Sequence, residues 1–383
     1  MKIPLAWLQL KREKIRLLVA LIGISFADIL MLMQLGFRSA LFESATLFHR
    51  SLNGEIVLIS SKSVALIAMS SFSERLLYQA ISLPEVENVS PIYLGFADWK
   101  IPQSYGRRSI FVIGFNPDEQ VMNLPGVQQN LDKLKTPDTV LFDQGSSSRY
   151  GPVVSEFNHN GSFVTEVNDH KITTVGLFTM GPSFGADGNL ITSDLTSLQI
   201  LKNKQKEGLI HLGLIKLKPG VKAEPVIAAL RAYLPKDIRV FSKQEYIDFE
   251  QNYWNSGSVI GFIFAFGLAI GFLVGTVIIY QILYSEVSDH LPEYATLKAI
   301  GYTDNYLLRV VFQEALILAI LGYFPGYVIS YWLYKFARSA TMLPMTMTVS
   351  KAMSVLLLSC LMCTISGAIA ALKLRNADPA DIF

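Results

Sequence analysis

The stretch Val259–Leu283, VIGFIFAFGLAIGFLVGTVIIYQIL, contains no charged residue and decides the fold class. About 20 consecutive apolar residues are enough for a helix to cross the hydrocarbon core of a bilayer. Three further stretches meet this criterion, at residues 17–35, 315–334 and 352–372. Of the 383 residues, 51% are hydrophobic and 17% are charged, whereas a soluble protein usually carries about 25% charged residues. The sequence therefore predicts a membrane protein with four transmembrane helices.

The spacing of the four stretches predicts the organisation of the chain. A long polar block separates the first two, and short loops join the others. We expect a cytoplasmic amphipathic helix at 1–16, transmembrane helices at 17–41, 256–285, 305–334 and 352–373, a periplasmic domain at 42–255, a cytoplasmic loop at 286–304, a periplasmic loop at 335–351 and a cytoplasmic tail at 374–383.

The orientation follows from lysine and arginine residues near the spans, because they favour the cytoplasmic side. Nine lie on the side of the two termini and three on the opposite side. The nine are Lys2, Lys11, Arg12, Lys14, Arg16, Lys298, Arg309, Lys373 and Arg375, and the three are Lys335, Arg338 and Lys351. Both termini are therefore predicted to be cytoplasmic. The first stretch lacks an A-x-A-like site at its end, so we do not expect a cleaved signal peptide.

Two strand–helix–strand patterns at the ends of the polar block predict a split βαβ, ferredoxin-like layer. EIVLISS and EVENVSPIYLGFADWK flank a helical pattern in the first, and GLIHLGLIKLKPG and KDIRVFS do so in the second. Between about 116 and 206, a turn-rich β pattern predicts an inserted β-rich subdomain, with Asn160-Gly161 as a hairpin signal. The expected class is α+β. The helical pattern at 242–257 is expected to continue into the second span.

Several catalytic and binding sites are not supported by the sequence. Gly181–Gly185, GPSFG, matches a nucleophile elbow around Ser183, but the Asp187-Gly188-Asn189 that follows breaks the required helix. A turn is the preferred interpretation, and an esterase is the alternative. No Gly-Lys dipeptide occurs, so a P-loop is excluded, and the histidines have no metal-ligand spacing. The net charge of +2 argues against a nucleic-acid surface.

Polar and small residues inside the spans are candidate packing positions. A central aspartate costs about 2.5–3.5 kcal/mol of insertion free energy, so Asp28 is expected to face protein, in either a switching or a structural role. Glu314, near a cytoplasmic end, is expected to be partly hydrated. Glycines at four-residue spacing let helices approach closely. They are Gly261, Gly267, Gly271 and Gly275, and they predict a contact face either within the chain or between two copies.

The cytoplasmic loop His290–Thr303, HLPEYATLKAIGYT, predicts a short rigid helix. Pro292 suits its first turn and Gly301 its end. Glu293 and Lys298 lie near the helix ends whose dipole they complement. Four side chains are expected to be available for docking on a partner: Leu291, Tyr294, Leu297 and Ile300.

The segment PEYATLKAIGYT resembles the REIALLRALGAS signature of FtsX/MacB/LolC-type ABC permeases. Glu293, Lys298 and Gly301 match its glutamate, basic and glycine positions. QEALIL and NADPADIF resemble two further segments of that class. FADILMLMQLGFRSALFES and SDHLPEYATLKAIGY are similar to DevC-like permease subunits of exporters. Tyr294 and Tyr302 depart from the isoleucine and alanine of the broader class.

This resemblance implies an inner-membrane permease of the mechanotransmission class, with the loop helix as the coupling helix. Two copies would join two separate DevA-like ATPase subunits that hold ATP and magnesium, while this chain binds no cofactor. A DevB-like periplasmic adaptor and a TolC-like outer-membrane channel would complete the path for a glycolipid cargo. The alternative implied by the resemblance is an FtsX-like signalling protein that activates a cell-wall hydrolase.

Overall fold

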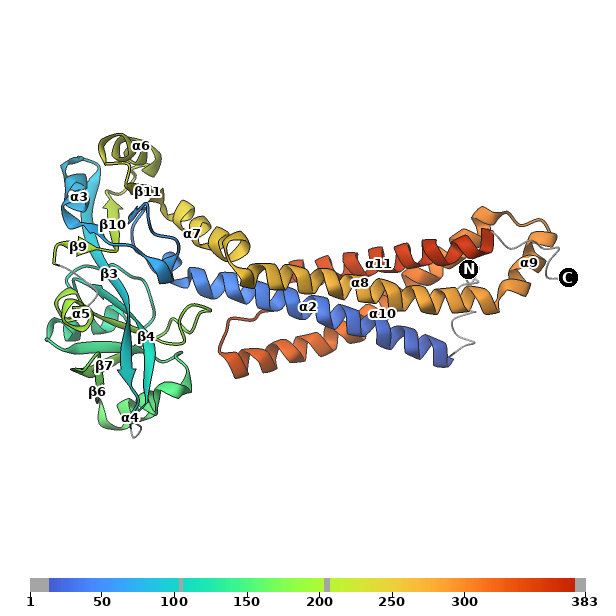
Figure 1. Cartoon of the computed structure of the whole chain (residues 1–383), viewed down its shortest axis with the longest axis horizontal. Coiled ribbons are helices and arrows are strands. Elements are labelled where there is room, and N and C mark those ends of the chain that lie inside the picture. Colours follow the sequence, from blue (N-terminus) through green and yellow to red (C-terminus); the bar gives the residue numbers. More distant parts are fainter. Residues whose placement is uncertain (1–13, 103–105, 203–206, 376–383) are drawn as a thin grey trace. The chain divides into compact units, whose positions relative to one another are not determined.

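The computed structural model describes residues 14–102, 106–202 and 207–375 (Figure 1). The described chain forms two compact units, and each is considered by itself. The helical unit contains residues up to 40, 259–341 and from 345 onward, and the β-rich unit contains residues 41–258 and 342–344. The predicted amphipathic helix at 1–16 lies mostly outside the described residues, as does most of the predicted tail at 374–383.

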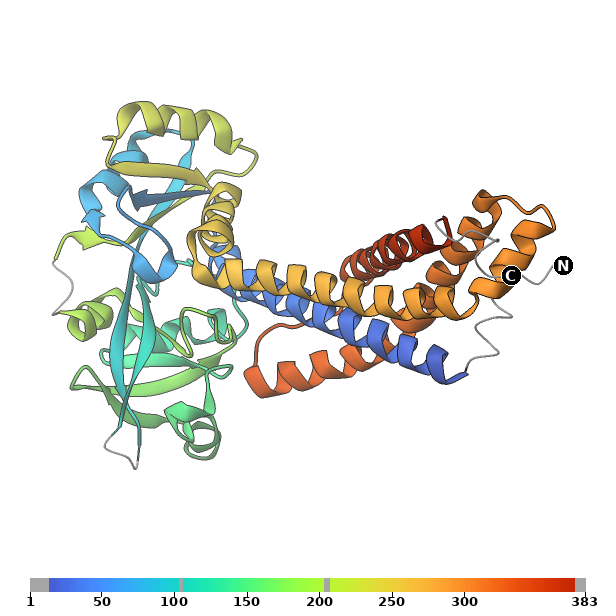
Figure 2. The same cartoon turned by 45° about the vertical axis from the view of Figure 1, so that its right-hand side comes forward.

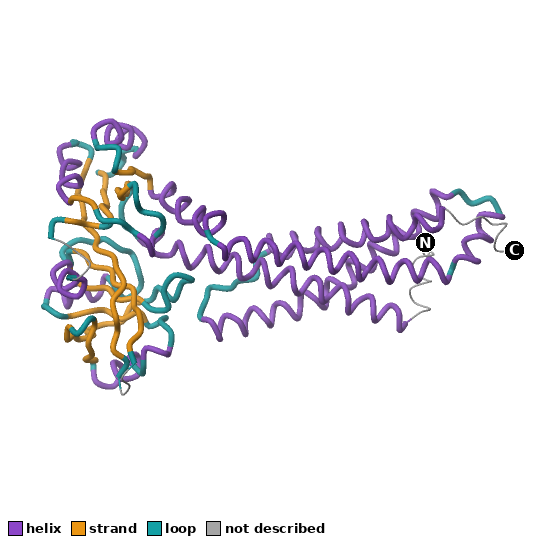
Figure 3. The backbone as a smooth tube through the Cα atoms, in the orientation of Figure 1, coloured by secondary structure: helices purple, strands orange, loops and turns teal. Residues whose placement is uncertain are grey.

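Figure 3 separates helices from strands along the chain. The longer helices are α2 (Lys14–Ser51), α4 (Val153–Asn160), α5 (Asp194–Leu201), α6 (Ala223–Tyr233), α7 (Lys243–Asn252), α8 (Val259–Asp289), α9 (Leu291–Ala299), α10 (Asp304–Thr341) and α11 (Val349–Arg375). The shorter ones are η1 (Leu66–Ala68), α3 (Glu74–Tyr78), η2 (Gln79–Ser82), η3 (Gln128–Lys135), η4 (Ser148–Tyr150) and the π-helical η5 (Tyr253–Gly257).

The strands are β1 (Ile56–Ser60), β2 (Phe72–Ser73), β3 (Val86–Lys100), β4 (Arg107–Phe115), β5 (Thr139–Asp143), β6 (Phe163–Val167), β7 (His170–Phe178), β8 (Asn189–Ser193), β9 (Leu209–Ile210), β10 (Leu212–Leu217) and β11 (Ile238–Ser242).

The helical unit is built from α2, α8, α10 and α11, which run side by side in Figures 1 and 2. Each contains an apolar window long enough to cross a membrane, so the four predicted spans are confirmed as helices within the described residues. A helix satisfies its own backbone hydrogen bonds, as a bilayer requires. Their shared core includes Ile24, Ala27, Met31, Leu283 and Met362.

One end of the β-rich unit has the predicted ferredoxin-like arrangement. The strand order is β11-β1-β10-β3, and all three pairs are antiparallel. Helix α3 connects β1 to β3, and α6 connects β10 to β11. Both helices contribute to the core on this layer, through Leu77 of α3 and through Val226, Ile227 and Leu230 of α6. The split βαβ prediction is therefore confirmed.

The rest of the β-rich unit, which contains the predicted β-rich part at about 116–206, continues the same sheet. Strand β3 is 15 residues long. Its first half pairs with β10 and its second half with β4. The order then continues β4-β8-β5-β7-β6, so nine described strands share one sheet. The β4–β8 and β5–β7 pairs are parallel. All residues of β5 and β8 are buried, as expected for strands covered on both faces.

The hairpin expected at Asn160-Gly161 is wrong. Asn160 ends α4, and Gly161 is the left-handed residue that closes this helix, with φ of 72°. The tight hairpin lies instead between β6 and β7, where Asn168 and Asp169 both have positive φ. Two successive positive φ values are the property of a type I′ turn, and Asn and Asp tolerate them better than most residues.

The expected continuity between the 242–257 helix and the second span is also wrong. Helix α7 gives way to the π-helical turn η5, and Ser258 then adopts an extended conformation with φ −119° and ψ 146°. Helix α8 begins only at Val259. The uninterrupted element is α2, whose residues belong to both units.

Candidate functional site

Helix α9 owes its sharp boundaries to local sequence. Pro292 lies in the first turn, where its missing N–H is not needed. The Nδ1 atom of His290 lies 3.1 Å from Oε2 of Glu293. At the other end, the N–H of Tyr302 donates to the carbonyl of Leu297 at 3.0 Å, and that of Gly301 donates to Lys298 at 2.9 Å. This pair of bonds is a Schellman motif. It requires the φ of +104° that Gly301 supplies.

The inner face of α9 packs on the chain itself, which corrects the prediction that Tyr294 is available to a partner. Tyr294 is 2% exposed. It belongs to a cluster with Val287 of α8, Leu307 and Val311 of α10, and Ala371 of α11. Leu291 and Leu297 pack against this cluster. Three of the four apolar side chains therefore anchor α9 to the helical unit.

The outer face of the loop is exposed and partly apolar. Ile300, the fourth predicted docking residue, is 71% exposed. Tyr302 and Tyr306 follow it and are also exposed, with ring centroids 4.8 Å apart. Glu293 is exposed on the same helix, and Lys298 is half-buried. The departure of Tyr302 from the family pattern thus lies on the exposed surface, where large apolar side chains are typical of protein interfaces.

Asp28 is fully buried inside the helical unit. Its Oδ2 accepts a long hydrogen bond of 3.4 Å from the hydroxyl of Ser359 on α11. A Cβ built at Gly326 of α10 would lie 3.1 Å from Cβ of Asp28. Asp28 is therefore enclosed by three helices. Glu314 is 1% exposed, so the expectation of partial hydration is wrong, because its side chain lies inside the unit.

The glycine face of α8 packs within the chain. A Cβ at Gly267 would meet Gln34 of α2, and one at Gly271 would contact Met31. At Gly275 a Cβ would lie 2.7 Å from Cβ of Ala27 and 2.3 Å from Sδ of Met362. Gly261 is also buried. The sequence left open whether the glycines pack within the chain or between two copies. Three of the four, Gly267, Gly271 and Gly275, contact other helices of the same chain.

A second small-residue contact was missed in the sequence. Gly322 and Gly326 of α10 have the same four-residue spacing, and a Cβ at Gly322 would lie 2.6 Å from Cβ of Ile24. The hydroxyl of Ser25 donates to the carbonyl of Gly322 at 2.8 Å. The GxxxG spacing of these two glycines was a readable signal.

Comparisons with known proteins show what parts of the chain are similar to. Residues 265–379 match the family model described as FtsX-like permease C-terminal. This stretch contains most of α8, all of α9 and α10, and α11. The chain is 22% identical over 340 residues to an uncharacterized ABC transporter permease protein of Mycobacterium tuberculosis. That alignment covers 86% of this chain and 37% of the relative, so the chain spans little more than a third of the relative's length.

Two solved structures are similar to part of the chain. The periplasmic region of MacB from Actinobacillus actinomycetemcomitans has 10% identity and a TM-score of 0.36, covering 53% of this chain and 94% of that one. The extracellular domain of the noncanonic ABC-type transporter YknZ from Gram-positive bacteria has 11% identity and a TM-score of 0.32, covering 49% and 100%.

The residues considered for catalysis, around Ser183, form a loop. Ser183 accepts hydrogen bonds through Oγ from the N–H groups of Gly185 and Ala186. The segment after it continues as a loop to β8, so the helix of a nucleophile elbow is missing from this described stretch. Over the described ranges, no group of three or more His, Cys, Asp or Glu side chains has the arrangement of a metal site.

Acidification is expected to destabilise the β-rich unit through His211. Burial lowers the pKa of its imidazole to about 4, whereas an unfolded histidine titrates near 6.5. Between these values the unfolded state binds more protons, so the free energy of unfolding falls as the pH is lowered. Above this window neither state is protonated and the contribution is constant.

The measurement is the thermal unfolding of the full chain at pH 7 and pH 5. His211→Gln keeps an acceptor for the N–H of Leu94, which now donates to Nδ1 at 3.1 Å, and should reduce the loss of stability at pH 5. His159→Gln removes an exposed histidine and is the control. Equal pH dependence in wild type and His211→Gln would contradict the assignment.

Proposed function

We propose that this chain is the permease subunit of an ABC exporter in which a separate ATPase subunit binds the outer face of α9. The observation that carries the proposal is the contrast between α9 and the turn that follows it. Helix α9 is anchored through the cluster around Tyr294, whereas Ile300 and Tyr302 in the turn and Tyr306 at the start of α10 are exposed. A short, capped helix with an exposed apolar surface is suited to receive a partner and to transmit its movement.

The anchored face supports a route for that movement. The cluster around Tyr294 joins α9 to α8, α10 and α11. A displacement of α9 would therefore act on three helices at once, because a close-packed core transmits strain. Helix α2 packs on α8 and α10 through the glycine contacts and contributes residues to both units. Conformational change would reach the β-rich unit through α2.

The wider assembly follows from the sequence resemblance. A homodimer of this chain would join the ATPase subunit, which would bind ATP and magnesium. A periplasmic adaptor and a TolC-like channel would complete a path for a glycolipid, and both termini would be cytoplasmic. The absence of a P-loop from the sequence supports a nucleotide site on another polypeptide.

Ile300→Glu is expected to reduce ATPase association by at least about tenfold, because a charge would replace an apolar contact at the centre of the proposed interface. The measurement is quantitative mass spectrometry of proteins that carry a G-x-x-x-x-G-K-[ST] motif and co-purify with the tagged full chain. Val64→Glu places the same charge on an exposed position of the β-rich unit, where Val64 is 52% exposed, and should leave association unchanged. Wild-type recovery with Ile300→Glu would contradict the proposal.

The same purification distinguishes export from signalling. Recovery of an adaptor and an outer-membrane channel supports the exporter, whereas recovery of a cell-wall hydrolase supports the alternative. The orientation is tested separately with Thr296→Cys, at an exposed position of α9, in a chain whose Cys360 and Cys363 are replaced by alanine. A membrane-impermeant thiol reagent should label this cysteine from the cytoplasmic side. Labelling from the periplasmic side would exclude α9 as the ATPase contact.

A further inference from the structure

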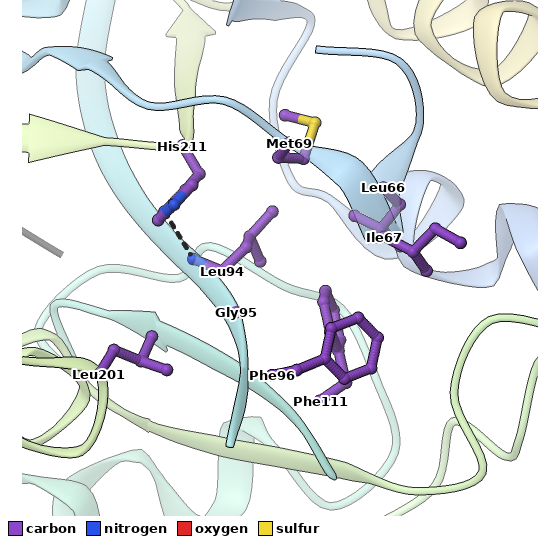
Figure 4. Close-up of a pocket in the computed structure, with 9 residues that line it drawn as sticks. All are labelled: Leu66, Ile67, Met69, Leu94, Gly95, Phe96, Phe111, Leu201 and His211. Atoms are coloured by element: carbon purple, nitrogen blue, oxygen red, sulfur yellow. Dashed lines mark hydrogen bonds between the residues drawn. The ribbon is translucent and has the colours of Figure 1, made fainter. Parts of the chain in front are cut away.

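The β-rich unit contains an apolar cavity that the coupling mechanism does not use. It has a volume of about 250 Å³ and is partly open to solvent. Figure 4 shows its walls. Leu94 and Phe96 of β3 and Phe111 of β4 form one side, and Leu66 and Met69 approach from the loop around η1. An apolar cavity of about 150 Å³ already admits a small apolar ligand, so this cavity can hold part of an alkyl chain.

Among the described residues that line this cavity, His211 has the only polar side chain. Burial keeps the pKa of its imidazole at about 4, so the ring is neutral at physiological pH. Nδ1 accepts the N–H of Leu94 at 3.1 Å, as the dashed line in Figure 4 marks, which leaves the ring proton on Nε2. The cavity therefore presents no net charge. A chain that carries a charge at its apolar end would be excluded, because burying an unpaired charge is costly.

A second cavity adjoins the first and is more open to solvent. Its volume is about 470 Å³, and its lining combines three polar side chains, Arg108, Ser109 and Asp187, with Phe96, Phe184, Gly185 and Ala186. It is called the polar cavity after the first three. Arg108 and Asp187 form an ion pair, and the guanidinium of Arg108 lies 5.6 Å from the centre of the Tyr150 ring. The carboxylate side chain of Asp187 is 54% exposed, and that of Arg108 is 25% exposed. The pair offers both donors and acceptors without net charge.

The two cavities meet at Phe96, which lines both. They also meet at Gly185, a residue of the polar cavity. A Cβ at Gly185 would lie 2.4 Å from Cγ2 of Ile67, which lines the apolar cavity. The GPSFG loop, Gly181–Gly185, thus ends at the boundary between an apolar compartment and a polar one. Such a neighbourhood matches a molecule whose two ends differ in polarity.

We infer that these cavities form one binding site for a single-chain amphiphile with an uncharged, hydroxyl-rich head. The alkyl chain would lie among Leu94, Phe96, Phe111 and Met69, and the head would exchange hydrogen bonds with the Arg108–Asp187 pair. Neither cavity carries a net charge, so a ligand with an anionic or a cationic head would bind less well than one with an uncharged head. The inference rests on the proposed export function for its biological meaning, since it places a cargo-binding site on the β-rich unit.

Photo-labelling of the full chain in lipid nanodiscs tests the site. Three dodecyl probes share a diazirine in the chain and differ in the head: a glucoside, a carboxylate and a trimethylammonium. Labelled peptides are quantified by mass spectrometry. The glucoside should label peptides containing Leu66–Met69 and Leu94–Phe96 at least about fivefold more than either charged probe. Equal labelling by all three, or none in these peptides, would overturn the inference.

Two variants and one control test where the alkyl chain and the head of the glucoside probe bind. Met69→Trp fills the apolar cavity and should lower glucoside labelling about tenfold. Val64→Trp adds the same ring at an exposed position outside the lining and should change nothing. Arg108→Gln leaves Asp187 unpaired, so glucoside labelling should fall and trimethylammonium labelling should rise. Unchanged labelling with Met69→Trp would overturn the site.

An internal standard separates a binding defect from misfolding. All probes should also label the lipid-facing residues of α8 and α11, and this labelling should be equal in wild type and variants. The assay contains no ATPase, so a negative result leaves the proposed coupling at α9 untouched. Conversely, loss of ATPase association in Ile300→Glu should leave glucoside labelling unchanged.

Discussion

Gly275→Ile is expected to prevent α2, α8 and α11 from packing together. Even a single Cβ at this position would lie 2.3 Å from Sδ of Met362 and 2.7 Å from Cβ of Ala27. Both distances are shorter than any van der Waals contact, and a branched side chain adds three more carbons. Overpacking of a close-packed core typically costs about 1–3 kcal/mol, and we expect the upper end because two neighbouring helices must move.

The measurement is thermal unfolding and monodispersity of the full chain in detergent. Ala269→Ile adds bulk to an exposed position of the same helix and should have little effect. If Gly275→Ile were as stable as wild type while the chain lost its ability to dimerise, the glycine face would belong to an interface between copies. That outcome would contradict the packing described for Gly275.

Glu250→Ala is expected to destabilise the β-rich unit by about 2–4 kcal/mol, because two buried donors lose their acceptor. Glu250 is 1% exposed. Its Oε2 accepts the N–H of Leu66 at 2.8 Å, and its Oε1 accepts the indole N–H of Trp254 at 2.9 Å. Nε2 of the buried His49 lies 3.5 Å from Oε2. One carboxylate thus joins α2, α7, the η1 loop and the π-helical turn.

Thermal unfolding followed by tryptophan fluorescence measures this effect. Glu250→Gln retains one acceptor and should lose about half as much stability. Asp248→Ala is the control, because it removes an exposed carboxylate of the same helix, whose Oδ1 accepts a hydrogen bond from Nε2 of Gln244 at 2.9 Å. A stability loss no greater than that of Asp248→Ala would show that Leu66 and Trp254 find other partners.

The parts of the fold that the sequence predicts are those determined by local pattern. The uncharged run of Val259–Leu283 and its three counterparts required membrane helices. The paired strand–helix–strand patterns led to the ferredoxin-like layer, because each strand and helix has its own hydrophobic period. These signals need no knowledge of distant contacts, and the structure confirms them.

The parts that failed depend on contacts between distant residues. Strand β3 divides its hydrogen bonds between β10 and β4, and no local pattern within Val86–Lys100 marks the change of partner. The Asn160-Gly161 dipeptide suits both a hairpin turn and the end of a helix. In the structure it ends helix α4. The parallel pairing of β4 with β8 joins strands separated by more than 70 residues, so it could not be read from either segment.

The sequence predicted the helix of the candidate coupling site but not which of its side chains are buried and which are exposed. The capping residues Pro292 and Gly301 carried enough information to locate α9. Which side chains are exposed depends on α8, α10 and α11, and these helices bury Tyr294 while leaving Ile300 exposed. The proposed amphiphile site was not predicted at all, because the residues that line it come from six separate segments of the sequence.

The continuous helix α2 and the break at Ser258 before α8 differ in how they would accommodate an inserted residue. Helix α2 is continuous from Lys14 to Ser51, so one residue inserted near Ala40 would turn the rest of this helix by about 100° about its axis, since an α-helix has 3.6 residues per turn. Near Ser258 the extended backbone ends the helix, and the same insertion would be absorbed locally. We therefore expect an insertion to be tolerated better at Ser258 than within α2.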